Sequence, residues 1–289
     1  MDTFLERRKE NTEQFWFTDN FYDKMLPARC KFYHRRILPM TIAVALIGKD
    51  AIVLATDSRW CEKAEDSEDL YYHDKLKKLW KLSGTLALAC TTNDMAYSYL
   101  LIELFKQKIT QQKLDESNIG EIVDKFSYLA NNNLGRHFNR PFKKLIEQGT
   151  PSLLLISAGM CFIFVGFGKN RNPQIGYCTK KTGEMAFHFG LWQQPFFLAG
   201  VPKIGMYLRK KIESQISELN LKSLKRLAVI LILETATLEP SVGGAIQMVV
   251  IPKDGKSYEL PEAELTELEA YIKKNIEKLD KGFLRMVKG

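Results

Sequence analysis

The 289 residues are enough for one large domain or two small ones, and 45% of them are hydrophobic and 26% charged, as in ordinary soluble globular proteins. The net charge of +8 is spread along the chain and offset by 34 acidic residues, so we expect a mildly basic surface and no nucleic-acid partner. No apolar run reaches the roughly 20 residues that span a bilayer, and the charged start MDTFLERRKENTEQ has no apolar signal-peptide region. We therefore expect no membrane partner and a cytoplasmic location.

Cysteine and histidine give no sign of a metal or disulfide framework. An odd number of cysteines without a C-x-x-C pair indicates free thiols in a reducing compartment. The histidines lack the spacing of metal ligands, and no glycine-rich phosphate loop is present, so we expect neither a metal nor a cofactor. The residues concerned are Cys30, Cys61, Cys90, Cys161, Cys178, His34, His73, His137 and His188.

Regular structure is predicted to begin abruptly after residue 40. Residues 1–39 carry aromatic side chains without a clear period, whereas IAVALI (42–47) and AIVLATD (51–57) flank a GKD turn. This pattern predicts a hairpin whose strands are buried on both faces. The polar segment 61–74 is expected to be a loop. A second hairpin is predicted around Ser83–Gly84, from LKKLWKL and TLALACT.

The apolar period then becomes helical. Asn93 can cap a helix over MAYSYLLIELFKQKI, and a second helical stretch runs from about residue 119 to about residue 148. We expect this second helix to be bent or interrupted near Gly135 and Pro141.

Strands and helices alternate in blocks over the remaining chain. The predicted strands are SLLLISAG, MCFIFVGF, QIGYCTK, MAFHFG, FFLAG and AIQMVVI, and the predicted helices cover about 203–219, 221–237 and 261–284. Blocks of strands followed by helix pairs disfavour βαβ crossovers. They favour an α+β fold, a four-layer αββα sandwich of two antiparallel sheets flanked by helices, in one domain over 41–289.

A threonine hydroxyl is a weak nucleophile that needs a base within hydrogen-bonding reach. When threonine is the first residue of a chain, its own α-amino group, with a pKa of about 7.7–8.0, can accept the proton. A nearby lysine adds positive charge, and a carboxylate beside that lysine fixes its position.

Three motifs together resemble a known family. Thr41 opens the first predicted strand, Asp57-Ser58-Arg59 closes the second, and Lys78 lies in a Lys-Lys pair before a later strand. This order resembles mature proteasome-type β subunits, which are N-terminal-nucleophile (Ntn) hydrolases. The resemblance implies Thr41 as nucleophile, Lys78 as the lysine that tunes it and Asp57 as the partner of the lysine, with Arg59 as an accessory residue.

The later part of the chain carries a fainter resemblance. The segment from Ala199 through Gly200 to Gly205 is similar to a strand–helix junction that holds an accessory serine in the family, although Val201 stands at the serine position. The loop from Glu239 through Ser241 to Gly244 is similar to the loop with accessory Asp and Ser, and its S-V-G portion is closest to the bacterial ancestral β-subunit branch. The oxyanion-hole position, usually glycine, falls at Thr91–Thr92.

Residues 1–40 leave three explanations open. Met40 is the initiator and the preceding 39 residues do not belong to the protein, or the segment is a propeptide cut by a route other than cleavage after glycine, or it is retained and the chain is not a hydrolase. We favour the first because regular structure is predicted to start so sharply at Thr41.

The leading functional hypothesis is a proteasome-like threonine peptidase that cleaves peptides or unfolded proteins after residues 1–40 are removed. The resemblance implies a homo-oligomer, ring-like or helical, and leaves open an ATP-dependent unfoldase as partner. The alternatives are a catalytically silent structural or assembly subunit and an amidohydrolase that acts on a small amide.

Overall fold

In the computed structural model, the chain divides into two units, Met1–Leu38 and Pro39–Gly289, and the described residues lie in the second. They are residues 41–63, 70–92, 95–112, 114–147, 159–181, 184, 186–200 and 214–288. Several predicted features lie outside them, namely the segment 1–39, the cap Asn93, Val201, and most of the predicted strand 152–159 and helix 203–219.

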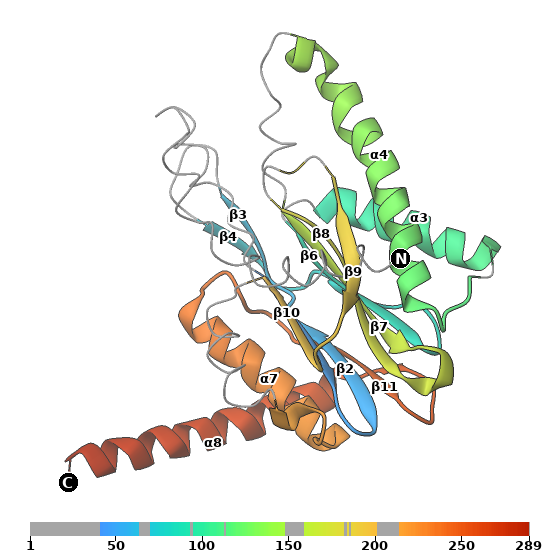
Figure 1. The fold of residues 1–289 in the computed structure, drawn as a ribbon. Helices are drawn as coiled ribbons and strands as arrows, with labels where there is room; N and C mark the ends of the chain where they lie inside the picture. The colour runs from blue at the N-terminus through green and yellow to red at the C-terminus, as the bar shows by residue number, and fades with distance from the viewer. Residues whose placement is uncertain are drawn as a thin grey trace, which may run out of the picture. The chain divides into compact units, whose positions relative to one another are not determined.

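Two five-stranded antiparallel sheets form the centre of the fold (Figure 1). The first sheet has the order β10-β1-β2-β11-β12 and the second β5-β6-β7-β8-β9. The strands of the first sheet are β1 (Ile42–Ile47), β2 (Ala51–Thr56), β10 (Phe196–Gly200), β11 (Gln247–Pro252) and β12 (Tyr258–Glu259). Those of the second are β5 (Leu79–Lys81), β6 (Leu86–Thr92), β7 (Met160–Phe167), β8 (Pro173–Lys180) and β9 (His188–Trp192). Both predicted hairpins are therefore present.

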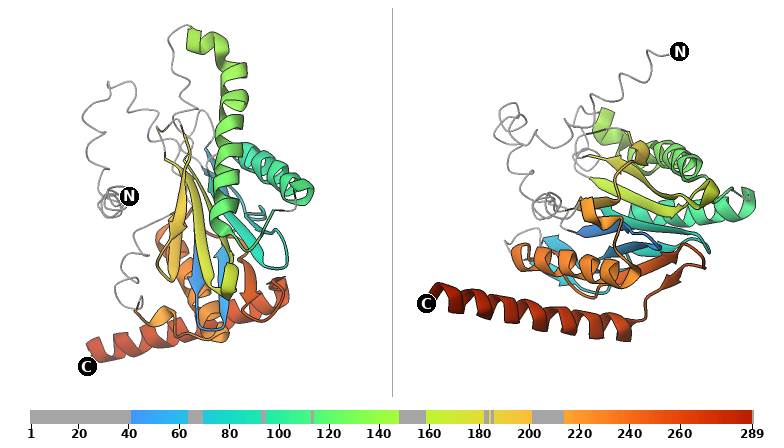
Figure 2. Two further views of the ribbon diagram at one scale, coloured as in Figure 1. Left: turned by 45° about the vertical axis from the view of Figure 1, so that its right-hand side comes forward. Right: turned by 60° about the horizontal axis from the view of Figure 1, so that its bottom comes forward.

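Helices cover the outer face of each sheet, so the described part has four layers (Figure 2). Helices α3 (Met95–Gln112) and α4 (Ile119–Glu147) pack on the second sheet, whereas α7 (Leu221–Leu238) packs on the first and α8 (Glu262–Lys288) packs on α7. A short 3₁₀ turn, Lys169–Arg171, joins β7 to β8. The αββα fold predicted from the sequence is confirmed.

One detail of the sequence prediction is wrong, and a second is wrong in part. The expected loop 61–74 contains a two-stranded sheet, β3 (Trp60–Lys63) with β4 (Leu70–His73), because its aromatic residues favour strands despite the acidic composition. Helix α4 runs without interruption past Gly135 and Pro141, so the expected interruption is absent, and the expected bend stays a prediction. A proline removes one backbone donor, and the rest of the helical hydrogen-bond ladder can continue beyond it.

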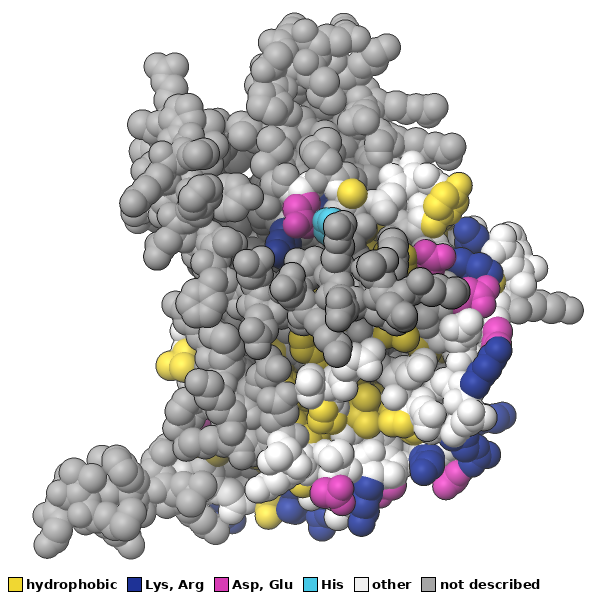
Figure 3. Space-filling view, in the orientation of Figure 1, with side chains coloured by type: hydrophobic (Ala, Val, Ile, Leu, Met, Phe, Trp, Pro, Cys, Tyr) yellow, Lys and Arg dark blue, Asp and Glu magenta, His cyan; other side chains and the backbone are white. Residues whose placement is uncertain are grey.

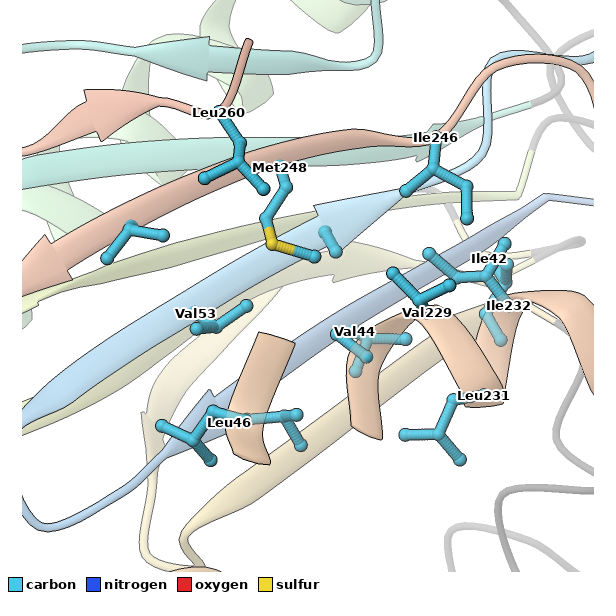
Figure 4. Close-up of a cluster of buried hydrophobic side chains, with 14 of the residues drawn as sticks. Ile42, Val44, Leu46, Val53, Val229, Leu231, Ile232, Ile246, Met248 and Leu260 are labelled. Carbon is cyan, nitrogen blue, oxygen red and sulfur yellow. The ribbon is translucent and has the colours of Figure 1, made fainter. Parts of the chain in front are cut away.

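The first two strands are buried on both faces because each face packs on a different layer. Val44 and Leu46 contact the α7 side, where Val229 and Ile232 contribute to the same cluster (Figure 4). The opposite face of β1 presents Ala43, and small side chains are frequent in the cluster between the sheets. Alanines at this position let the two sheets approach closely enough to bring their strand ends together.

The described surface carries lysine, arginine and acidic side chains intermixed along the face seen in Figure 3. This mixture agrees with the expected dispersed charge. Within the described ranges, no helix is both long enough and apolar enough to cross a membrane.

Phe126 on α4 tests the packing of the helical layer on the second sheet. Its ring lies 4.7 Å from that of Phe162 and 5.0 Å from those of Phe105 and Phe164, measured between ring centroids. We predict that Phe126→Ala lowers the free energy of unfolding by about 3–5 kcal/mol, because it removes a buried ring and leaves a cavity. Tyr128→Ala, on the same helix but 65% exposed, should change it by no more than about 0.5 kcal/mol. Urea denaturation followed by circular dichroism measures both, and equal losses would contradict the packing described.

Candidate active site

The three residues predicted to form the catalytic centre meet in space. Thr41 immediately precedes β1, Asp57 immediately follows β2, and Lys78 immediately precedes β5. The Thr41 hydroxyl donates a hydrogen bond to Asp57 Oδ1 over 3.0 Å and accepts one from Lys78 Nζ. Lys78 Nζ lies 3.1 Å from Asp57 Oδ1. The first sheet therefore supplies the hydroxyl and the carboxylate, and the second supplies the amine.

The Asp57 carboxylate is fully buried and hydrogen-bonded on both oxygens. Oδ1 accepts from the backbone N–H of Ile42 over 3.1 Å, and Oδ2 accepts from the N–H groups of Arg59 and Gly243, each over 3.2 Å. Burial raises the pKa of Asp57, while Lys78 and the N–H groups of Ile42 and Gly243 oppose that rise. These donors replace the water that a buried carboxylate loses.

The Lys78 amine is 1% exposed and has three acceptors: the Thr41 hydroxyl, Asp57 Oδ1 and the backbone carbonyl of Arg59. An ammonium group has three donors, so its hydrogen-bonding capacity is filled. Burial lowers the pKa of Lys78, and Asp57 partly offsets this effect. Lys78 thus releases a proton more readily than a surface lysine, and in its neutral form it can accept the proton of the hydroxyl it contacts.

Arg59 contributes its backbone to the centre and directs its side chain elsewhere. The guanidinium forms a two-point ion pair with Asp74, with Nε–Oδ1 at 2.6 Å and Nη2–Oδ2 at 3.0 Å, and Nη1 donates to Pro240 O over 2.7 Å. It also lies over the ring of Tyr72, 4.8 Å from the centroid. The hydrogen bonds to Arg59 lower the pKa of Asp74. Arg59 therefore ties the β3–β4 sheet to the loop before β11.

Gly200 lies against Thr41. It pairs with Ile42 in the register of β10 and β1 and has φ of +100°. A Cβ atom built there would lie 1.5 Å from the carbonyl oxygen of Thr41. Glycine is therefore required both by backbone conformation and by space.

Glu239 and Ser241 contact each other, and no hydrogen bond of the described residues joins either side chain to Thr41, Asp57 or Lys78. The Ser241 hydroxyl donates to Glu239 Oε1 over 2.9 Å. The loop reaches the centre through its glycines instead. Gly243 donates its N–H to Asp57, and Gly244 has φ of +71°.

Thr91 and Thr92 end β6 and are buried. The preceding residue, Cys90, donates its N–H to the Lys78 carbonyl over 2.9 Å, which places this strand end next to the lysine. Residues 93–94 lie outside the described part of the chain, so the oxyanion role of Thr91–Thr92 stays a prediction.

Three residues that hold the site were not predicted from the sequence. They are Asp74, Gly243 and Gln247, whose carboxamide accepts a hydrogen bond from the Lys78 N–H. Asp74 was hidden in an acidic segment, where no feature distinguishes it from its neighbours. Gly243–Gly244 was visible as a pair, but its contact with Asp57 depends on how β11 enters the first sheet.

Cys61, Cys90, Cys161 and Cys178 are free thiols, while Cys30 lies outside the described residues. Over the described ranges, no three His, Cys, Asp or Glu residues are grouped so as to hold a metal ion.

Two antiparallel sheets between helical layers are the architecture of the Ntn-like fold. The chain shares this fold with solved structures, including two of Anbu. The chain is similar to a chain in the helical assembly of the Anbu complex from Pseudomonas aeruginosa, with a TM-score of 0.60 and 19% identity over 86% of this chain and 96% of that one. It is also similar to an Anbu mutant from Hyphomicrobium sp. strain MC1, with a TM-score of 0.52 and 17% identity over 83% of this chain and 96% of that one.

No protein-family model and no curated protein matches the sequence. The structural similarity to the two Anbu structures establishes the fold. At such low sequence identity the chemistry has to be argued from the residues of the site.

The buried pair of Lys78 and Asp57 gives a prediction for stability. Lys78→Met leaves the Asp57 charge without its partner, so we predict a loss of about 3–5 kcal/mol in the free energy of unfolding at pH 7. Burial raises the pKa of Asp57, so the carboxylate takes up a proton and loses its charge as the pH falls. The loss of stability in Lys78→Met should therefore become smaller at lower pH. Asp57→Asn combined with Lys78→Met should cost less than the sum of the single changes.

Asp74→Asn is the matched control for that measurement. It breaks an ion pair whose side chains are partly exposed, so it should cost no more than about 1 kcal/mol. Urea unfolding at several pH values compares the variants. A loss in Lys78→Met no larger than in Asp74→Asn would show that the pair is not the buried, mutually dependent unit described.

Proposed function

We propose that this chain is a proteasome-like threonine hydrolase that cleaves peptide bonds through an acyl-enzyme on Thr41. The observation that carries the proposal is the contact of one hydroxyl, Thr41 Oγ1, with both a buried amine of lowered pKa and a buried carboxylate. A threonine nucleophile needs a proton acceptor within hydrogen-bonding reach, and this arrangement supplies one.

The chemistry follows from the contacts. Neutral Lys78 accepts the proton of Thr41 Oγ1 as the oxygen attacks the carbonyl carbon of the substrate. The tetrahedral intermediate collapses when the leaving amine takes that proton from Lys78, which breaks the carbon–nitrogen bond and leaves an ester on Thr41. Water then attacks the ester with Lys78 again as proton acceptor, and the returned proton restores the Thr41 hydroxyl as the carboxylic acid leaves. Asp57 holds the charged lysine in place, and a backbone N–H near Thr91–Thr92 is the proposed donor to the oxyanion.

Removal of residues 1–40 would add a second proton acceptor. The α-amino group of a terminal Thr41 would have a pKa of about 7.7–8.0 and would be attached to the nucleophilic residue itself. In this proposal residues 1–40 are an extension that is absent from the active form, and residues 41–289 are the catalytic domain.

The two similar structures support a proposal about assembly and branch. The P. aeruginosa structure is a helical assembly of the Anbu complex. We propose that this chain is nearest that branch and that it associates with copies of itself. We also propose that it acts on peptides or unfolded proteins in the cytoplasm, with an ATP-dependent unfoldase as a candidate partner.

The nucleophile is tested by two substitutions at one position. Thr41→Ala should lower kcat/KM for a quenched fluorescent peptide by at least about 10³-fold, because no other residue replaces the lost hydroxyl. Thr41→Ser keeps a hydroxyl and should stay active. Thr110→Ala, which removes an exposed hydroxyl on α3, is the control and should leave the rate unchanged.

The assay should use a panel of peptides and small amides, with the intact mass of each preparation recorded first. Mass spectrometry then shows whether the active species begins at Thr41. Activity that survives in Thr41→Ala would overturn the proposal. Hydrolysis of small amides alone would indicate an amidohydrolase, and inactivity of the form beginning at Thr41 would indicate a silent assembly subunit.

A further inference from the structure

Gln247 occupies a position that links the two halves of the site. It is the first residue of β11 and pairs with Thr56, the residue before Asp57. Val249 and Ile251, on the same face of β11, pack in the cluster between the two sheets. Alternation along the strand therefore directs the Gln247 side chain from the first sheet toward the second.

The carboxamide of Gln247 makes two hydrogen bonds to the backbone that carries Lys78. Its Oε1 accepts from the Lys78 N–H over 2.9 Å, and its Nε2 donates to the Leu76 carbonyl over 2.5 Å. The Leu76 carbonyl and the Lys78 N–H lie on either side of Lys77. In a parallel pair of strands, the backbone of one residue makes the same two hydrogen bonds to the residues before and after its neighbour. The opposite orientation of the amide would set donor against donor and acceptor against acceptor, so the contact fixes it.

Other backbone groups of the segment 76–78 are bonded to different parts of the fold. The Leu76 N–H donates to the Ser58 carbonyl over 3.1 Å, and the Lys78 carbonyl accepts from the Cys90 N–H over 2.9 Å. Lys78 lies just before β5, which is the edge strand of the second sheet and pairs only with β6 among the described strands. The Gln247 side chain supplies a partner for this backbone, and without it the Lys78 N–H would lose its acceptor.

We propose that Gln247 is a positioning residue that sets the backbone of Lys78 so that its amine meets both Thr41 and Asp57. A lysine side chain has a long, flexible stem, so its amine is placed only when both ends are held. Asp57 and the Arg59 carbonyl hold the amine, and Gln247 holds the backbone. The proposal rests on the proposed function, because positioning matters to the reaction only if Lys78 serves Thr41.

Among the described residues, few charged groups lie near the Lys78 amine, so the cause of a change in its pKa can be identified. The nearest charge is Asp57, Asp74 lies farther away and is paired with Arg59, and the thiols of Cys61 and Cys90 are close. Burial raises the pKa of both thiols, so they stay neutral near pH 7. A change in the pKa of Lys78 in Gln247→Met, which introduces no charge, therefore reports on the position and solvation of the amine.

Two variants of Gln247 and one control test the proposal on the protein as purified, with the first residue of each preparation recorded by intact mass. Gln247→Met removes both hydrogen bonds while keeping the length of the side chain. Gln247→Glu keeps the acceptor but turns the donor into an oxygen that repels the Leu76 carbonyl. Gln174→Met replaces a half-buried glutamine at the far end of β8, opposite Gly166.

The first measurement is the pKa of the Lys78 amine by NMR of ¹³C-labelled lysine side chains, with the signal assigned by its loss in Lys78→Met. We expect it to rise toward the ordinary lysine value in Gln247→Met and in Gln247→Glu, because the amine becomes more hydrated or gains a negative neighbour. We also expect kcat to fall about 100-fold with KM changed less than about twofold. Gln174→Met should match the wild type in both.

Failure of this proposal can be told apart from failure of the proposed function. If the protein hydrolyses no amide but the pKa of Lys78 still moves in both Gln247 variants, positioning stands and the hydrolase proposal falls. An unchanged pKa and kcat in Gln247→Met would overturn the positioning role even if that variant were less stable. Wild-type behaviour in Gln247→Glu would overturn the two-point contact.

Discussion

The Lys78 amine and the Asp57 carboxylate are removed from water at the point where the two sheets meet. Burying two charges costs several kcal/mol for each ion unless other groups replace the lost water. Here the replacement is complete on both sides. The amine has three acceptors, and the carboxylate receives three backbone N–H groups in addition to the amine and the Thr41 hydroxyl.

Much of the surrounding structure follows from supplying those partners. The loop before β11 must come close enough for Gly243 to donate to Asp57, and Arg59 holds this loop through Pro240. The start of β5 must reach the first sheet, and the Gln247 carboxamide spans that gap. Small residues between the sheets make the approach possible. The packing of the sandwich thus determines the geometry of the site.

The parts predictable from sequence were those governed by local pattern. The apolar runs IAVALI and AIVLATD indicate doubly buried strands without any knowledge of neighbours. The candidate centre of Thr41, Asp57 and Lys78 came from the resemblance to proteasome-type β subunits. The contributions of Gly243 and Gln247 depend on contacts between residues more than 150 positions apart in the chain. The contribution of Asp74 depends on its pairing with Arg59 in the folded chain. The β3–β4 sheet was not predicted, because the acidic composition of residues 61–74 indicated a loop although their aromatic side chains favour strands.

Direct trapping of the acyl-enzyme tests the central claim, that a buried lysine and carboxylate activate Thr41. The protein would be incubated with a β-lactone, which acylates an activated hydroxyl and stays attached, and the adduct would be located by peptide mass spectrometry. The account predicts one acyl group per chain on Thr41, retained in Asp74→Asn and lost in Lys78→Met. An adduct on another residue, or equal labelling of Thr41 in Lys78→Met, would contradict it.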